Sequence, residues 1–198
     1  MMANTHIVMA KHIYSNLNLK EKRVVSYRNF LYGNIKPDMV SKYKLKKHYM
    51  DESFDMVMDK IKVLSSLSDN EIRKLPEIVS FSQELGVVCH FLCDFFCIPH
   101  SERWEFKHSM NKHVKYEKDL SNFAKEFKLP RERAKVFGFY NIEEFILRAH
   151  EFYREDSSFV NDLVFSSYVC NSVVDYIIDC IEFNSSIGGR LVNSIGIS

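Results

Sequence analysis

The segment from Leu85 to Pro99, LGVVCHFLCDFFCIP, is the most apolar stretch of the sequence, yet it contains a histidine and an aspartate. The wider apolar segment from Leu75 to Cys97 is predicted to form the central buried helix. A bare carboxylate at Asp94, with aromatic neighbours on both sides, would cost several kcal/mol of desolvation. The nearest basic residue in the sequence is Arg103, so a metal ion is a better partner for this carboxylate than a salt bridge.

The rest of the chain predicts a single all-α domain. A length of 198 residues is usual for one domain, and six glycines and four prolines give few turns and long uninterrupted segments. We expect a helical bundle over residues 1–184, followed by a flexible Ser- and Gly-rich tail over 185–198. The segment 34–42, NIKPDMVSK, predicts a turn. Apolar residues at helical spacing predict helices near 7–17, 24–33, 52–67, 75–97, 109–127, 142–153 and 157–183.

Charge and composition limit the classes of partner. The net charge is +1, from 27 basic and 26 acidic residues, so no global field attracts nucleic acid or anionic lipid. The first residues lack a cationic start followed by an apolar run, and the longest apolar stretch is too short to span a bilayer. We therefore expect a soluble, cytoplasmic protein without a transmembrane segment and without stable nucleic-acid binding.

The five cysteines do not form a thiolate metal motif. Cys89, Cys93 and Cys97 recur every four residues, which places them along one face of a helix without the geometry for mutual disulfides. No CxxC pair is present. We expect reduced cysteines packed as small hydrophobic side chains.

Two histidine–carboxylate pairs at helical spacing indicate a metal site. His90 and Asp94 are four residues apart, so both side chains leave one face of their helix. A proline is expected to end that helix, and His100 follows at the turn. His113 and Glu117 form a second pair with the same spacing. Imidazole and carboxylate are donors suited to zinc, and two such pairs flanking a third histidine within 28 residues favour shared ligation over ordinary buried histidines.

The sequence ELGVVCHFLCDFFCIPH, followed by HVKYE, resembles the core motif of the zinc-dependent phospholipase C family, which also contains the fungal single-strand nucleases. That family has an HxxxDxxxxxH run and then HxxxE or HxxxD, which matches the spacings 90/94/100 and 113/117. Its other ligands are an early histidine, an aspartate in a PD turn and a later histidine. In this sequence the corresponding residues are His6, Asp38 and His48, so the resemblance covers roughly residues 1–120.

The resemblance implies a polynuclear metal cleft in a helical bundle. The first zinc would be held by Asp38, His48, His90 and Asp94. The second would be held by His100, His113 and Glu117. The third would be held by His6 and the other oxygen of Asp94, with the N-terminal amine and carbonyl. Because the first two sites do not need the N-terminus, we expect two zinc ions, with the third depending on the amine of Met1.

The resemblance also implies a phospholipase C-like phosphodiesterase. A metal-bridging hydroxide would attack phosphorus in line, with Asp38 and Asp94 catalytic and Asp38 the general base. The substrate would be a phosphoester, with phospholipids among the candidates. Family phospholipases place aromatic residues beside the PD aspartate and before the later histidine to receive choline. Met39 and Leu45 stand at those positions here, so choline specificity does not follow.

Two alternatives remain open from the sequence. A single-strand nuclease or 3′-nucleotidase-type phosphodiesterase would use the same metals, but it would need an aromatic pocket for base stacking. A non-catalytic helical protein would use zinc only to stabilise the bundle. Structural zinc is fully ligated by protein, whereas catalytic zinc keeps a position for water, so an open coordination position separates these classes.

Overall fold

The computed structural model describes residues 1–40, 47–104, 110–138 and 140–195, with side chains described as far as residue 187. Over these residues the chain forms helices and no strands, which confirms the all-α prediction. The helices are α1 (Ala3–Asn16), a 3-10 turn (Glu21–Arg23), α2 (Tyr27–Gly33), α3 (Lys36–Met39), α5 (Met50–Ser65), α6 (Asp69–Ile72), α7 (Glu77–Phe95), α8 (Ile98–Ser101), α10 (Met110–Glu126), α11 (Ile142–Tyr153) and α12 (Phe159–Ile195).

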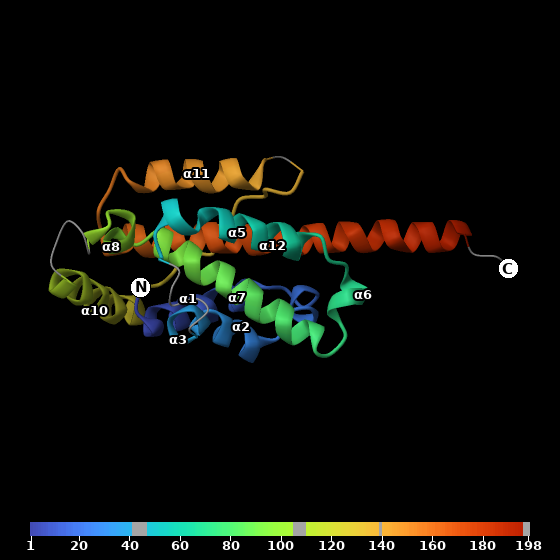
Figure 1. Ribbon diagram of the computed structural model, residues 1–198, viewed down its shortest axis with the longest axis horizontal. Helices are drawn as coiled ribbons and strands as arrows, with labels where there is room; N and C mark the ends of the chain where they lie inside the picture. Colours follow the sequence, from blue (N-terminus) through green and yellow to red (C-terminus); the bar gives the residue numbers. More distant parts are fainter. Residues whose placement is uncertain (41–46, 105–109, 139, 196–198) are drawn as a thin grey trace.

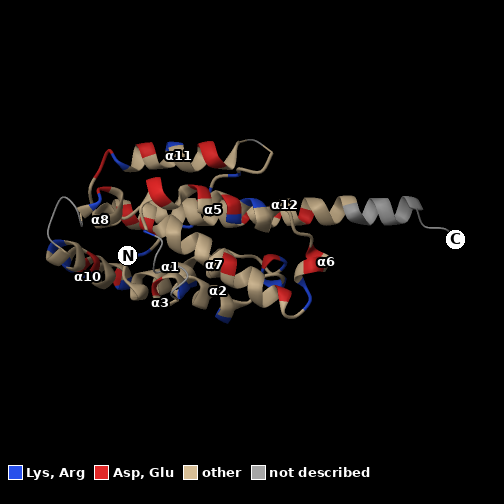
Figure 2. Cartoon of the chain, viewed as in Figure 1, with Lys and Arg blue, Asp and Glu red and all other residues tan. Residues whose placement is uncertain are grey.

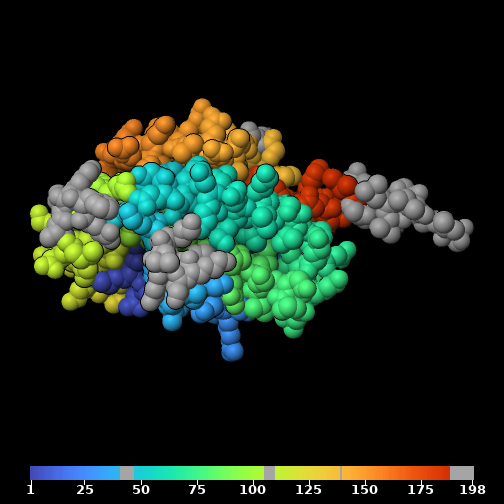
Figure 3. Space-filling model, viewed as in Figure 1, coloured from blue at the N-terminus to red at the C-terminus, as the bar shows by residue number. Residues whose placement is uncertain are grey.

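Helix α7 is the centre of the bundle, with α2, α5 and α12 packed around it (Figure 1). Helix α7 forms within the predicted segment 75–97, and every residue from Leu85 to Pro99 is buried, whereas residues 75–80 are exposed or half-buried. The five cysteines are free and buried, as expected. Basic and acidic residues, coloured blue and red, are interspersed along the helices in Figure 2. In the space-filling view, α5 and α11 cover much of the face turned to the viewer, and α12 is visible mainly toward its C-terminal part (Figure 3).

The two prolines near the expected ligands begin helices, whereas the sequence analysis placed a turn at the first and a helix end at the second. Pro37 lies in the first turn of α3, and Pro99 lies in the first turn of α8. Proline is well tolerated at these positions, because the first helical N–H groups have no partner within the helix and the fixed φ already suits the helix. The turn prediction was therefore wrong over residues 36–39, and α7 ends at Phe95, before the proline.

The final helix does not end at the expected domain boundary. Helix α12 continues through residue 184 and ends at Ile195, so the boundary between 184 and 185 falls inside a helix. The domain limits of 1–184 and 185–198 remain a prediction.

Two helices are long and apolar enough to cross a membrane by length and composition, α7 and residues Phe159–Ile187 of α12. Most of each is buried inside the bundle, which is typical of core helices. The expectation of no transmembrane segment remains a prediction.

A pair of glycines brings α2 into direct backbone contact with α7. A Cβ atom on Gly86 would lie 2.5 Å from the main-chain oxygen of Phe30 and 2.8 Å from the Cα of Gly33. A Cβ on Gly33 would lie 2.2 Å from the main-chain oxygen of Gln83. Gly33 ends α2, as expected, but its role is this close approach. The contact places the segment after α2, including α3, against the middle of α7.

Candidate metal centre

The first group of donor atoms consists of His48, His90 and Asp94, whose ligand atoms all lie within 4.8 Å of one another. His90 and Asp94 lie one turn apart on α7, and His48 precedes α5. The Asp94 Oδ2 atom is 2.7 Å from Nδ1 of His48 and 3.2 Å from Nε2 of His90. These two ring nitrogens are themselves 3.2 Å apart, so three donors face one point.

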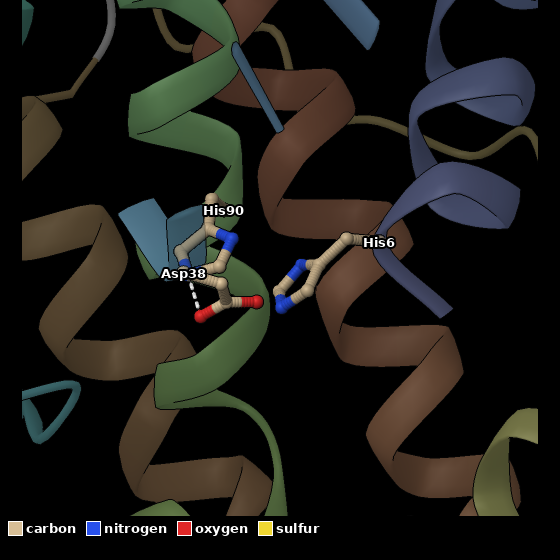
Figure 4. A group of neighbouring side chains, drawn as sticks. All are labelled: His6, Asp38 and His90. Atoms are coloured by element: carbon tan, nitrogen blue, oxygen red, sulfur yellow. Dashed lines mark ion pairs between the residues drawn. The ribbon is translucent and has the colours of Figure 1, made fainter. Parts of the chain in front are cut away.

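A second group joins His90 to His6 on α1 and Asp38 on α3 (Figure 4). The rings of His6 and His90 are stacked, with centroids 3.9 Å apart. The Asp38 Oδ1 atom is 3.7 Å from Nε2 of His90 and 3.9 Å from Nδ1 of His48. Nε2 of His6 is 3.3 Å from Oδ1 of Asp94. The two oxygens of Asp94 therefore face different donors, as a bridging carboxylate requires.

The third group is formed by His100 on α8 with His113 and Glu117 on α10. The Glu117 Oε1 atom is 2.8 Å from Nε2 of His100 and 3.2 Å from Nε2 of His113. Nε2 of His100 is 3.7 Å from Oδ1 of Asp94, which connects this group to the other two. The structure thus brings all eight expected ligands into one cluster, although their binding of zinc remains a prediction.

The amine of Met1 lies inside this cluster. It donates a hydrogen bond to Asp94 and lies 3.0 Å from both Nε2 of His100 and Oε1 of Glu117. Figure 1 shows the N-terminus near α1 and α10, at the end of the bundle where α8 also lies. The amine is therefore beside Asp94, as the resemblance implies, and it also contacts the third donor group.

Burial and charge set protonation states at His6, Asp94 and Glu117 that suit zinc. At His48, by contrast, burial is outweighed by the hydrogen bond to Asp94 and the charges of the nearby carboxylates, so the pKa is raised. Burial and the neighbouring His90 lower the pKa of His6 to about 3, so its imidazole is neutral. Burial opposes ionisation of Asp94, but the Met1 amine and the surrounding histidines hold the pKa of this carboxyl well below its usual range. Burial likewise opposes ionisation of Glu117, and the amine with hydrogen bonds from two histidines lowers its pKa. Zinc needs neutral imidazoles and ionised carboxylates.

The unsatisfied nitrogen atoms also fit a metal. Among the described residues, both ring nitrogens of His6 are buried without a well-formed hydrogen bond, although Nε2 lies 3.3 Å from Oδ1 of Asp94, and Nδ1 of both His100 and His113 is likewise buried without a partner. Buried polar side-chain atoms usually have a partner, so an imidazole with neither nitrogen satisfied requires an explanation. The His6 ring points toward the Asp38 carboxylate beside His90 (Figure 4). A cation bound between these groups would satisfy His6, and nitrogen and carboxylate donors in this mixture suit zinc.

Comparison with known proteins identifies the family. Residues 5–169 match the zinc-dependent phospholipase C family. The chain belongs to that family. No curated protein and no solved structure matches the chain. The match confirms the resemblance carried by the two histidine–carboxylate pairs, and it extends that resemblance into α12, beyond the expected limit near residue 120. The class of chemistry is that of a zinc-dependent phosphoesterase.

One feature of this phospholipase C family centre could not be read from residue types. The main-chain oxygen of Asn34 lies 2.8 Å from Nδ1 of His90 and accepts a hydrogen bond from it. That hydrogen bond fixes the tautomer that leaves Nε2 free to face the donor groups. The Asn34 amide donates to the main-chain oxygen of Phe30 at 2.9 Å, which holds the turn in place. The available signal was indirect: Gly86, one turn before His90, marks a close backbone approach.

The cluster is closed on one side and open on the other. His6, His90 and Asp94 are fully buried, whereas the side chain of Asp38 is 36% exposed and that of His48 is 16% exposed. A cavity of about 510 Å³ also opens beside His100. Its wall is formed by residues of α5, α8 and α11. Asp38 and His48 therefore reach the surface, and His100 is the cluster residue that lines the cavity.

Proposed function

We propose that this zinc-dependent phospholipase C family member is a phosphodiesterase that hydrolyses a phospholipid-type substrate at the histidine–carboxylate cluster. The first zinc is assigned to Asp38, His48, His90 and Asp94. The second is assigned to His100, His113 and Glu117. A third position uses His6 and Asp94 with the Met1 amine.

The observation that carries the proposal is the position of Asp94. Its Oδ2 atom faces His48 and His90, while its Oδ1 atom faces His6 and lies 3.7 Å from Nε2 of His100. A fully buried carboxylate with imidazoles on both oxygens has the arrangement of a bridging ligand in a two-metal or three-metal site. Such sites catalyse displacement at phosphorus.

The protein's own groups divide the work of hydrolysis. When bound, zinc lowers the pKa of a water molecule and neutralises charge that develops on the phosphoryl oxygens. Asp38, the most exposed carboxylate of the cluster, accepts the proton of the attacking water as general base. Asp94 and Glu117 supply the negative charge that holds the cations, and the buried histidines hold them in place. The buried inner side excludes bulk water from this part of the site.

The exposure of Asp38 also favours catalysis over a structural role for zinc. A structural zinc has four protein ligands and no access for water, whereas the proposed second site has three protein ligands, His100, His113 and Glu117. Here the cluster reaches the surface at Asp38 and His48, and a cavity opens beside His100. This openness supports a catalytic rather than a structural role for zinc.

The test combines metal content with turnover. Protein purified after growth in zinc-supplemented medium should contain at least two zinc per chain, and it should hydrolyse a p-nitrophenyl phosphodiester. Removing the metal with a chelator should abolish turnover, and added zinc should restore it. Fewer than one zinc per chain would contradict the proposal. A structural role for zinc is indicated if the protein binds two zinc ions but hydrolyses none of phosphatidylcholine, phosphatidylethanolamine, a short-chain analogue and single-stranded DNA. Preferential hydrolysis of single-stranded DNA would favour the nuclease alternative.

A further inference from the structure

A second buried carboxylate, Asp162, lies in the first turns of α12, outside the donor groups. It is completely buried, and its Oδ1 atom accepts a hydrogen bond from the hydroxyl of Tyr153 at 2.7 Å. Its Oδ2 atom accepts from the hydroxyl of Tyr116 at 3.0 Å and from the main-chain N–H of Ile98 at 3.4 Å. The carboxylate therefore connects α12 with the end of α11, with α10 and with the start of α8.

Two of these three partners lie next to expected ligands. Tyr116 directly precedes Glu117 on α10, and Ile98 lies two residues before His100 on α8. Helices α8 and α10 are the two that supply the His100, His113 and Glu117 group. Asp162 thus contacts both sides of this group without touching any of its ligand atoms.

The next turn of α12 supports the same corner of the fold. Oγ of Ser166 lies 3.3 Å from the main-chain oxygen of Phe96 and 3.4 Å from that of Cys93. These carbonyls belong to the last turn of α7 and the connection to α8. Asp162 and Ser166 are four residues apart, so one face of α12 binds the N–H and C=O groups on both sides of the α7–α8 corner.

Stability alone does not explain a carboxylate at position 162. Among the described residues, Asp162 makes no ion pair with a lysine, arginine or histidine, and its three partners are uncharged. A buried carboxylate without a cation is costly, and an apolar side chain of similar volume would often be more stabilising. Burial raises the pKa of Asp162 to about 7, even with three donors around it. No ion pair therefore compensates for the desolvation of the Asp162 carboxylate.

We propose that Asp162 is a positioning residue for the second metal site: it fixes α8 and α10 relative to each other so that His100, His113 and Glu117 converge. The inference rests on the proposed function, because it requires this group to hold zinc. Hydrogen bonds one step removed from metal ligands orient those ligands, and their loss typically costs about 10- to 100-fold in metal affinity or activity.

The experiment is a metal titration of the metal-free full chain carrying Asp162→Asn. The amide has the same size but only one acceptor oxygen, so it cannot accept all three hydrogen bonds: its NH₂ group would face either Tyr153, or both Tyr116 and the N–H of Ile98. We expect about a 10- to 100-fold weaker affinity at the second site, with the first site unchanged. Zinc is followed by calorimetry, and Co²⁺ by its visible absorption, which reports ligand geometry directly.

Asp175→Asn is the matched control on the same helix. Asp175 is also buried, and it pairs with Arg133 and Lys135 at 3.3 Å, about 20 Å along the helix from position 162. It should leave both metal affinities and the Co²⁺ spectrum unchanged. Equal loss of second-site affinity in Asp162→Asn and Asp175→Asn would attribute the effect to general destabilisation and overturn the proposal.

Tyr116→Phe gives a second, milder test, because it removes one hydroxyl and keeps the ring. It should weaken the second site by a smaller factor than Asp162→Asn and alter the Co²⁺ spectrum in the same direction. The inference is overturned if a folded Asp162→Asn protein binds zinc at the second site with wild-type affinity. If Asp162→Asn does not fold, wild-type affinity of the second site in Tyr116→Phe overturns it instead. Failure of the wild-type chain to bind two metal ions would instead overturn the proposed function.

Discussion

The main-chain oxygen of Asn34 lies 2.8 Å from Nδ1 of His90, and this hydrogen bond joins the packing of the bundle to its candidate metal centre. The bond forms because α2 and α7 touch through Gly33 and Gly86, which brings the end of α2 against the middle of α7. Side chains at these two positions would separate the helices. Small residues in the core therefore determine the orientation of a ligand one turn away.

The first prediction follows from that contact. Gly86→Ala adds a Cβ atom that would lie 2.5 Å from the main-chain oxygen of Phe30, a backbone atom that cannot rotate away. We expect a loss of about 1–3 kcal/mol in the free energy of unfolding, as for other overpacked cores. Zinc affinity should fall as well, because the Asn34–His90 hydrogen bond is stretched. Chemical denaturation and zinc titration measure the two effects.

Ser80→Ala is the control for this substitution, because Ser80 lies on the exposed side of the same helix. It should change the free energy of unfolding by no more than about 0.5 kcal/mol, and it should leave the zinc affinity unchanged. A Gly86→Ala protein as stable as wild type, with unchanged zinc affinity, would show that the two helices can separate without moving His90.

Much of the fold was predictable because the apolar pattern is helical throughout. The helix over 142–153 was predicted with the bounds that the structure has, and the buried helix around Asp94 follows from an apolar run with few turn residues. The short helices α3 and α8 were missed because each has only four residues, too few for periodicity, and each begins near a proline. Proline at a helix start and proline in a turn have the same local signature.

The candidate site was predictable to the extent that ligands are side chains with fixed spacing. The pairs at 90/94 and 113/117 stand out alone, whereas His6, Asp38 and His48 needed the resemblance, because no spacing connects residues on different helices. Asn34 was not predictable, since it acts through its main-chain oxygen. Asp162 could have been predicted, because the sequence FVNDLVF places a carboxylate in an apolar helix. The same argument singled out Asp94.

The second prediction concerns Asp94. Asp94→Asn keeps the size of the side chain but removes the charge and one anionic donor, so it should abolish hydrolysis of a p-nitrophenyl phosphodiester and reduce zinc content per chain. Elemental analysis and the hydrolysis rate are measured on the same preparation. Asp175→Asn, another buried carboxylate, should retain both wild-type values. Wild-type hydrolysis by Asp94→Asn would mean that this carboxylate is not a ligand.

The third prediction is a pH dependence of stability caused by Asp162. Burial raises its pKa in the folded state from 3.8 to about 7, so between these values the folded chain keeps a proton that the unfolded chain has lost. Rising pH in this window therefore destabilises the wild type, by up to about 4 kcal/mol for this group. Below the window the carboxyl is neutral in both states and has no such cost.

The comparison with metal-free Asp162→Asn isolates this group, because all other titrating groups are shared. The free energy of unfolding of wild type minus that of Asp162→Asn should decrease from about pH 4 to about pH 7 and stay level above that. Urea unfolding at a series of pH values gives this difference. A difference that is constant with pH would show that Asp162 ionises at its ordinary pKa in the folded protein.

The last prediction concerns the headgroup and rests on the residue beside the candidate general base. Met39 follows Asp38 on α3, and its side chain is 61% exposed, while the other position where family phospholipases place an aromatic, Leu45, lies outside the described residues. A quaternary ammonium gains about 0.5–2 kcal/mol from an aromatic face. Without a ring at position 39, the wild type should discriminate weakly between phosphatidylcholine and phosphatidylethanolamine.

Met39→Tyr should restore one ring and raise the ratio of the two kcat/KM values in favour of choline by roughly two- to thirtyfold, since about 1.4 kcal/mol corresponds to tenfold. Val63→Tyr is the matched control: Val63 is 62% exposed on α5, but it lies about 20 Å along the helix from the end next to His48. That substitution should leave the ratio unchanged. A strong choline preference in the wild type would mean that other aromatic side chains already form the pocket, and an unchanged ratio in Met39→Tyr would place the headgroup away from α3.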